Sequence, residues 1–523
     1  MHCFSYSSYG VLKTAFLFSA LMALFVTGCS SDTTCPSGSA EAACTQRFEP
    51  IHIAVPMERS TPEELGIEPY VGNPVVPKPI PALEITPHPL FTEDDSRIHN
   101  DHYNSAAYNR TGLAGPAIEV TTHELGELTG ICAMMTMLKN GYVVASCFRA
   151  DTEISVMLTM FDNENLNIVA QRDLGFRPFQ PNAAGGAYFT MDKEENIFIG
   201  PPSNRLEQYH IEVVDGAPEF VQDFSKEIPG LEPWDDVGEP GLQDTVIDFE
   251  GRFWFMVTDG RVGYLDPETD VVKMIDLEEG LQNSMVVDEG GVYMVTYQAL
   301  YRLSVGENGD IEQDWRAPYD PGEGTGVILP GSGTSPTLFG TEEDLITICD
   351  NAASQVNAVV FDRATGDRKC EIPLFRPDES ATENTAVGYG DELLFVNNGG
   401  FSGPFTEART MNTGMERYRV LRDGSGAVTG CENVWKNDDS IANSAQLATA
   451  SGVVWGYGAD VDVEDADRFY LVAHSWETGD EIFRSYVGDQ KPFDPITGQV
   501  HLHPDGTMYI GTFNGAVMMR EVE

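Results

Sequence analysis

Four short segments of this chain open in the same way. Near the start of each, Asn or Asp is followed by Ser or Thr and then by a small apolar run, as in residues 243–248, 282–288, 383–387 and 442–446. A second, more aromatic run follows each segment. A unit that recurs identifies a repeat architecture before any single motif does. The chain is therefore predicted to fold as a series of similar β units.

Strand-like runs bounded by turn residues fall into eight groups. These groups span residues 132–172, 187–224, 245–275, 284–315, 335–375, 383–435, 443–487 and 499–521. Eight four-stranded blades in a ring form an all-β β-propeller, and seven blades are the alternative if two groups belong together. The last group has only three runs, and we expect residues 115–122 to supply the missing strand and close the ring, because an open edge is sticky.

Recurrent turns strengthen the prediction of a propeller over residues 115–523. Asp362-Arg-Ala-Thr-Gly-Asp, Trp476-Glu-Thr-Gly-Asp and Asp266-Pro-Glu-Thr-Asp each separate a third from a fourth run, and residues 503–515 close the last unit. Together they resemble the quinoprotein dehydrogenase-like propeller superfamily. The resemblance implies the fold rather than one activity, since such propellers serve as enzymes, scaffolds and binding modules.

The dehydrogenases of that superfamily hold pyrroloquinoline quinone with Ca²⁺, usually beside a disulfide between adjacent cysteines. This chain has no adjacent cysteines and only six tryptophans. Pyrroloquinoline quinone is therefore not expected here. A haem-binding Cys-x-x-Cys-His motif is also absent from the sequence.

The first 28 residues read as an export signal. Lys13 precedes a 12-residue apolar run, residues 15–26, which is too short to span a bilayer. Val26-Thr-Gly-Cys29 resembles the lipobox of bacterial lipoproteins, which implies cleavage before Cys29 and lipidation of its thiol. Ser30, rather than Asp, follows the cysteine, as in lipoproteins sent to the outer membrane. We expect a cell-envelope protein, with residues 29–114 as a Pro-rich tether that becomes ordered near residues 95–108.

The charge balance limits the partners. There are 82 acidic against 31 basic residues, a net charge of −51. Such a surface repels nucleic acid and anionic membranes, so only the lipid anchor is expected to contact a membrane. Solubility in a salty medium explains the charge. Attraction of cations such as Ca²⁺ is the functional alternative.

Seven cysteines remain after removal of Cys3 and lipidation of Cys29. Cys132 and Cys147 flank a tight turn at residues 138–141. If 138 pairs with 141, then 132 faces 147, because both pairs sum to 279. The other expected pairs are Cys370 with Cys431, on outer strands of adjacent blades, and Cys35 with Cys44 in the tether. Cys349 is left over, and no Cys-x-x-Cys spacing suggests a metal site.

Innermost strands line the channel of a propeller, so the repeated openings are expected to gather polar groups at one mouth. The candidate ligand site comprises Asp244, Asn283, Glu383, Asn384, Asn443, Thr337 and His501. Convergent polar groups of this kind suit a hydrated cation or a polyol. The structural alternative is that these residues cap turns through side chain to backbone hydrogen bonds.

Two further sets of residues are candidates. Asp350, Asn351, Asn397 and Asn398 follow the second strands of two consecutive blades and could face the same mouth, or they could serve turns that need a positive φ. His99 and His102 could bind a metal, or they could hydrogen-bond within a packed segment.

The sequence leaves the reaction open. Gly-x-Ser-x-Gly and His-Glu-x-x-His motifs are absent. Six-bladed lactonases carry Glu, two Asn and Asp around Ca²⁺, and Glu383, Asn384, Asn283, Asn443 and Asp244 offer the same residue types. Our first hypothesis is a non-catalytic binding or scaffold module. The alternative is an enzyme, either a Ca²⁺-dependent hydrolase or a degenerate quinoprotein-type oxidoreductase. The ligand cannot be deduced.

Overall fold

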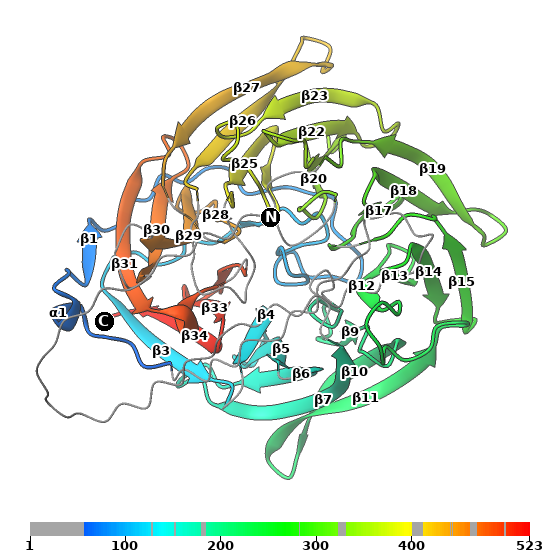
Figure 1. The fold of residues 1–523 in the computed structure, drawn as a ribbon, viewed down its shortest axis with the longest axis horizontal. Coiled ribbons are helices and arrows are strands. Elements are labelled where there is room, and N and C mark those ends of the chain that lie inside the picture. Colours follow the sequence, from blue (N-terminus) through cyan, green and yellow to red (C-terminus); the bar gives the residue numbers. More distant parts are fainter. Residues whose placement is uncertain are drawn as a thin grey trace, which may run out of the picture. The chain divides into compact units, whose positions relative to one another are not determined.

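Eight β-sheets follow one another around a ring, in chain order (Figure 1). The structure, a computed structural model, describes residues 57–126, 129–150, 153–178, 185–281, 283–322, 331–399, 412–439, 441, 443–460, 468–495 and 498–522. Seven sheets have four strands, and one has six because two strands of the N-terminal extension join it. The prediction of an eight-bladed propeller is confirmed, and the seven-bladed alternative is wrong.

Within each blade the strands run antiparallel from the inner to the outer edge of the ring. Blade 1 consists of β4 (Thr129–Met137), β5 (Val143–Ala150), β6 (Glu153–Phe161) and β7 (Ile168–Pro178), and blade 2 consists of β8 (Phe189–Met191), β9 (Ile197–Ile199), β10 (Arg205–Val214) and β11 (Ala217–Glu227). Blade 3 consists of β12 (Leu242–Ile247), β13 (Phe253–Val257), β14 (Arg261–Asp266) and β15 (Val271–Asp276). Blade 4 consists of β16 (Val286–Asp288), β17 (Gly291–Val295), β18 (Ala299–Val305) and β19 (Ile311–Pro318).

The other four blades repeat this order. Blade 5 consists of β20 (Thr337–Phe339), β21 (Leu345–Cys349), β22 (Asn357–Asp362) and β23 (Arg368–Pro373), and blade 6 consists of β24 (Val387–Tyr389), β25 (Glu392–Val396), β26 (Met415–Arg422) and β27 (Val428–Asn437). Blade 7 consists of β28 (Gln446–Ala448), β29 (Val453–Asp460), β30 (Arg468–Ser475) and β31 (Glu481–Asp489). Blade 8 contains β32 (His501–Leu502), β33 (Met508–Thr512) and β34 (Gly515–Glu521).

The ring closes through β3 (Ile118–Glu124), which pairs antiparallel with β34 from Ile118–Glu521 to Glu124–Gly515. Blade 8 thus takes its outer strand from the N-terminal side of the propeller, as the sequence predicted. This exchange removes an open edge and joins the two ends of the ring.

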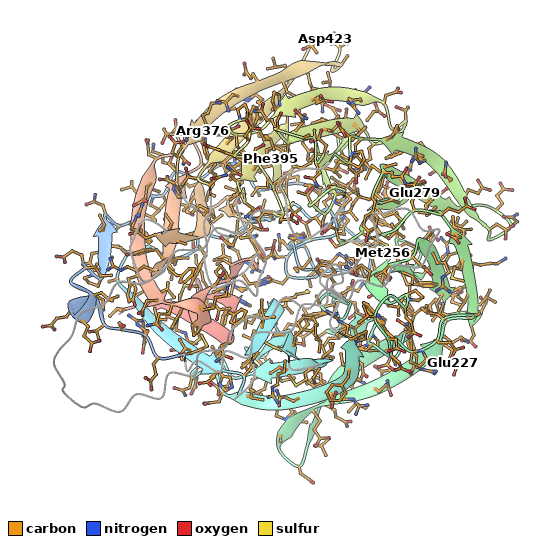
Figure 2. All side chains as sticks on the ribbon, viewed as in Figure 1. Glu227, Met256, Glu279, Arg376, Phe395 and Asp423 are labelled. Atoms are coloured by element: carbon orange, nitrogen blue, oxygen red, sulfur yellow. A yellow bond between two sulfur atoms is a disulfide. The ribbon has the colours of Figure 1, made fainter. Side chains whose placement is uncertain are left out.

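Apolar side chains fill the spaces between the blades. Figure 2 shows Met256 and Phe395 on strands inside the ring and Glu227 and Asp423 at its outer rim. Met256 and Phe395 are 0% and 1% exposed. Burial of one such side chain stabilises the fold by about 1.5–3 kcal/mol. Burial of the apolar side chains on the faces of neighbouring sheets therefore holds the blades together face to face.

The N-terminal extension lies on both edges of blade 7. It contains α1 (Pro62–Leu65), capped by Thr61, then β1 (Tyr70–Gly72) and β2 (Ala107–Tyr108). Strand β1 pairs with the outer strand β31 and β2 pairs with the inner strand β28. Between them the Pro-rich stretch is extended and hydrogen-bonds to the same blade through Lys78 and Ile80.

None of the helices in the described part of the chain is long and apolar enough to cross a bilayer.

Among the described residues there are two disulfides, Cys132–Cys147 and Cys370–Cys431, as predicted. The register assumed at the turn is wrong by one residue, because the Leu138 amide donates to the Tyr142 carbonyl. A bulge between Cys132 and Met134 then shifts the ladder back and places Cys132 opposite Cys147.

Cys370 and Cys431 link the outer strands of blades 5 and 6. Cys349 is buried and forms no disulfide. Cys29, Cys35 and Cys44 lie outside the described residues.

Candidate functional site

Residues 94–110, here called the plug, cross the centre of the ring (Figure 1). Plug carbonyls accept hydrogen bonds from the inner-strand amides of Met191, Val287, Leu338, Gly388 and Leu447, in blades 2, 4, 5, 6 and 7. In the other three blades the plug bonds to Thr136, Thr245 and Leu502. The inner strands would otherwise present unpaired backbone groups to the channel. The plug therefore hydrogen-bonds to all eight blades, and in seven of them to the backbone of the inner strand.

The plug turns tightly because several of its residues adopt left-handed backbone conformations. Asp95, Asn100, Asn104 and Ala106 have φ between 52° and 82°. The Asn100 side chain holds the two arms together, since its Nδ2 donates to the carbonyl of Ala107 at 2.6 Å and its Oδ1 accepts from the amide of Asp95 at 2.9 Å. Asn tolerates a positive φ better than other residues with a Cβ do.

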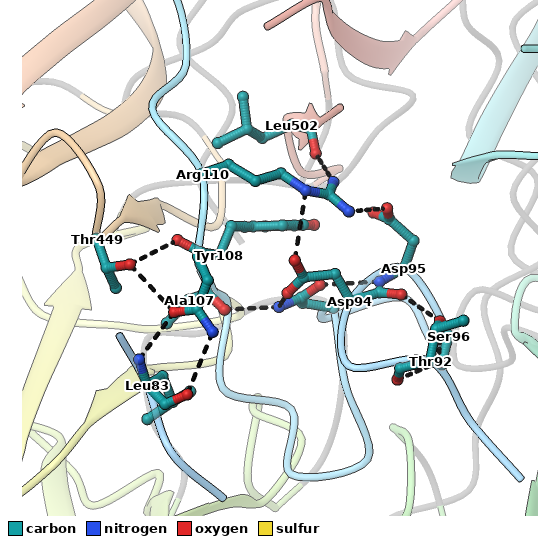
Figure 3. Close-up of polar contacts among 12 residues, drawn as sticks. Leu83, Thr92, Asp94, Asp95, Ser96, Ala107, Tyr108, Arg110, Thr449 and Leu502 are labelled. Atoms are coloured by element: carbon teal, nitrogen blue, oxygen red, sulfur yellow. Dashed lines mark hydrogen bonds and ion pairs between the residues drawn. The ribbon is translucent and has the colours of Figure 1, made fainter. Parts of the chain in front are cut away.

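An arginine fixes the plug to blade 8. Figure 3 shows Arg110 beside Asp94 and Asp95, with its guanidinium also donating to the carbonyl of Leu502. The closest oxygen of Asp95 lies 2.6 Å from Nη2 of Arg110. Burial raises the pKa of Asp95 to about 6, and the positive charge of Arg110 opposes this shift.

A second arginine lies at the centre of the ring. Nη2 of Arg97 is 2.7 Å from Oδ2 of Asp244, and its Nη1 donates to Thr190 and to the carbonyl of Thr245. Asp244 also accepts from the amide of Met285, in blade 4. Burial raises the pKa of Asp244, and Arg97 opposes this. A cation beside Asp244 would therefore meet the positive charge of Arg97.

The predicted channel residues form hydrogen bonds from one blade to the next. Asn283 of blade 4 donates to the carbonyls of Ser332 and Thr334, which precede blade 5. Oδ1 of Asn384, in blade 6, accepts from Ser444 of blade 7 at 3.3 Å.

The same pattern continues around the ring. Nε2 of His501, in blade 8, accepts from the amide of Met135 in blade 1. Thr337 of blade 5 donates to the carbonyl of Ala386 in blade 6. Asn443 bonds within its own blade, where its Oδ1 accepts from the amide of Tyr457. A ligand at these residues would have to share or replace these bonds.

The second predicted cluster lies at the ends of β21 and β25. Asp350 accepts from the amides of Ala352 and Asn357 and so closes a turn. Asn397 accepts from the amides of Ala381 and Gly399, and Asn398 accepts from the amide of Glu383. Asn351 is buried and its amide donates to the carbonyl of Asp320. None of these four described residues has a positive φ.

His99 and His102 do not converge. Both ring nitrogens of His99 lie near side-chain oxygens, Nδ1 at 2.8 Å from Gln499 and Nε2 at 3.1 Å from Thr385. His102 packs instead among the rings of His88, Tyr103 and Phe249. Burial lowers the pKa of His99 to about 4 and that of His102 to about 3.

Three buried carboxamides beside the plug have unused hydrogen-bonding capacity. Nδ2 of Asn384, Oε1 of Gln446 and Nε2 of Gln499 have no hydrogen-bond partner among the described residues. They belong to consecutive blades 6, 7 and 8, and Gln446 donates to Gln499 at 3.4 Å. We call these three residues the carboxamide cluster. Glu383, next to Asn384, is only partly buried.

Sequence reasoning missed Arg97, Gln446 and Gln499 as channel residues. Gln446 stands in one of the repeated openings, and this was the signal that could have marked it. Arg97 carries no such signal, because it lies outside the repeats and reaches the channel only through the fold of the plug.

Comparison with known proteins assigns no family to this chain. No family model matches the chain. An uncharacterized protein of Archaeoglobus fulgidus is 23% identical over 366 residues, which cover 63% of this chain and 68% of that protein.

Among solved structures, a europium-containing methanol dehydrogenase is 10% identical, with 82% of this chain and 98% of that chain covered and a TM-score of 0.45. The β-propeller domain of Cps50 (Swd1) from Myceliophteria thermophila is also 10% identical, with 77% and 99% covered and a TM-score of 0.39. Likenesses at this level carry no argument about the activity of this chain.

Proposed function

We propose that this protein is a lipid-anchored, non-catalytic binding module of the cell envelope that holds a small, neutral, polyhydroxylated compound in its channel. The carboxamide cluster carries the proposal. Leaving a buried donor or acceptor unpaired costs about 1–3 kcal/mol for each group. Water or a ligand hydroxyl must therefore complete the bonding of Asn384, Gln446 and Gln499.

The chemistry of the cluster favours hydroxyl groups. Its free atoms are two donors and one acceptor. A hydroxyl both donates and accepts, so one polyol can satisfy both kinds of atom. An anionic ligand would meet Glu383 and a chain of net charge −51. A cation would meet Arg97 at the centre of the plug.

The contacts of the plug favour binding over catalysis. A Ca²⁺-dependent hydrolase of the lactonase kind needs several oxygens free around one point. Here Oδ2 of Asp244 accepts from Arg97 and from the amide of Met285, and the Arg97 guanidinium would repel a cation at this carboxylate.

Titration calorimetry with neutral monosaccharides and disaccharides tests the binding function. Gln446→Leu and Gln499→Leu should each lower the affinity for the most tightly bound sugar at least tenfold, which corresponds to about 1.4 kcal/mol of binding free energy. Gln313→Leu is the control, because Gln313 is exposed on the outer strand β19. If no sugar binds, or if the control weakens binding equally, the proposal is wrong.

The anchor is tested separately. Metabolic labelling with an alkyne fatty acid should mark the wild-type protein, and membrane fractionation should retain it. Cys29→Ala should abolish both the label and the membrane association. A labelled or membrane-bound Cys29→Ala protein would rule out this anchor without affecting the binding proposal.

A further inference from the structure

We propose that Asp439, His474 and Glu481, at the seam between blades 6 and 7, form a binding site for one divalent transition metal ion. We call these residues the seam cluster. One ligand atom from each lies within 4.8 Å of the others. The site is separate from the channel and goes beyond the proposed function.

The fold holds the three side chains in place. His474 on β30 pairs directly with Glu481 on β31, so both side chains project from the same face of blade 7. Asp439 follows β27 of blade 6. Its amide donates to the Asn437 side chain and its carbonyl accepts from Gly414. The ligands therefore come from two blades and from backbone that is already fixed.

The buried histidine points at the carboxylate of the neighbouring blade. His474 is completely buried, and its Nε2 lies 2.8 Å from Oδ2 of Asp439. Ligands about 2.0–2.2 Å from a shared tetrahedral ion stand roughly 3.4 Å apart. A shift of about half an ångström would thus turn this contact into a pair of metal ligands.

A cavity of about 190 Å³ opens beside the cluster. Asp439 and Glu481 line it together with Asp438 and Asp460, and Arg484 is the one cation among the described residues that line it. Four carboxylates against one guanidinium leave excess negative charge there. A water molecule needs about 10–15 Å³ of such space, so the cavity has room for a solvent ligand to complete the coordination.

The donor set selects the kind of metal. One imidazole nitrogen and two carboxylate oxygens suit Zn²⁺ or a similar first-row ion better than Ca²⁺, which takes oxygen ligands only. Arg484 pairs with Glu481 and would orient this carboxylate without touching the ion.

The alternative is an ion-pair network that needs no metal. The difference matters for stability, because a metal would tie blade 6 to blade 7 as the disulfide Cys370–Cys431 ties blade 5 to blade 6. Both interpretations use the same contacts, and only metal titration separates them.

The test uses the full mature chain, freed of metal with EDTA and titrated with Zn²⁺ by calorimetry. We expect one site per chain that raises the melting temperature and that weakens at least tenfold in His474→Asn and in Glu481→Gln. Glu477→Gln is the matched control, since Glu477 is 69% exposed and its loss removes the same charge nearby. This control should bind Zn²⁺ like the wild type.

Co²⁺ provides a second readout. Its visible absorption should change when it binds the wild type and should lose intensity in Glu481→Gln. Glu481 is partly exposed, so we expect Glu481→Gln to fold, and this variant still tests the proposal if His474→Asn fails to fold. Equal Zn²⁺ binding by all variants would mean a surface-bound ion only and would overturn the proposal, as would no binding at all.

Discussion

Nη2 of Arg97 lies 2.7 Å from Oδ2 of Asp244, although 147 residues separate the two in sequence. Their side chains are 1% and 0% exposed. Arg97 belongs to the plug and Asp244 to the inner strand of blade 3, so this ion pair joins the N-terminal extension to the centre of the propeller. The extension is thereby a structural part of the ring.

Arg97→Met should destabilise the protein strongly. Removal of one partner leaves the Asp244 carboxylate buried without its counter-charge, which costs about 3–5 kcal/mol. Denaturant unfolding measures the loss. The control is Arg376→Met, because Arg376 and Asp438 are also 2.7 Å apart but 63% and 74% exposed. Exposed pairs contribute under about 1 kcal/mol. Equal losses in both variants would contradict the structural role of Arg97.

Asn100→Ala should loosen the plug. The change removes hydrogen bonds to Asp94, Asp95 and Ala107 and places alanine at a φ of 82°. A loss of about 2–4 kcal/mol is expected, combining unpaired buried groups with backbone strain. Hydrogen exchange should accelerate at the amides of Leu338 and Gly388, which donate to the plug. Unchanged exchange there would show that the plug does not depend on Asn100.

The two disulfides should differ in their effect on stability. The Cys370–Cys431 link spans 61 residues and the Cys132–Cys147 link spans 15. Loop-closure entropy predicts losses of about 4 and about 3 kcal/mol for the respective double serine variants. Melting of the two variants under matched conditions checks the order. A larger loss for the shorter loop would show that the packing of β4 on β5 outweighs the loop entropy.

Stability should fall on acidification. Burial lowers the pKa of His99 to about 4 and that of His501 to about 3, whereas the unfolded residues titrate near 6.5. The stability from these neutral rings is present above pH 6.5 and is lost as the pH falls through the folded pKa values. Each contributes about 3 kcal/mol or more over that range. Unfolding between pH 7 and pH 4 measures the slope.

The ionisation of Asp101 should make stability fall as the pH rises, which is opposite to the effect of the two histidines. Burial raises its pKa to about 7, against an ordinary value of 3.8. The stability that protonated Asp101 contributes to the folded state is fully present below pH 3.8 and is lost as the pH rises through 7. Asp101→Asn should therefore remove this opposing trend, so that stability rises more steeply with pH between pH 5 and 7 than in the wild type. A variant with the wild-type slope in that range would show that Asp101 does not titrate there.

Much of the fold was predictable because each blade is specified locally. The number of blades was predicted from the strand runs and the Thr-Gly-Asp type turns. The closure of the ring by residues 115–122 was predicted because the last group has only three strands. The pairing of Cys132 with Cys147 was also predictable, although for a partly wrong reason. The bulge that corrects the register depends on packing between strands, which no local pattern reports.

The channel residues were harder to predict. Asp244, Asn283 and Asn384 could be selected from their repetition, but their partners could not. Asn283 bonds to residues that precede the next blade, and Asp244 bonds to an arginine from outside the repeats. The unused ends of Gln446 and Gln499 are visible only once their neighbours are placed.

The sequence by itself determined the ring of eight sheets, since apolar alternation and turn chemistry act over a few residues and repeat along the chain. Only the tertiary structure decided what occupies the centre of the ring and what meets at the seam of blades 6 and 7. The plug and the seam cluster join residues from different repeats or from outside them. Such contacts depend on how the chain closes in space, and spacing in the sequence does not encode them.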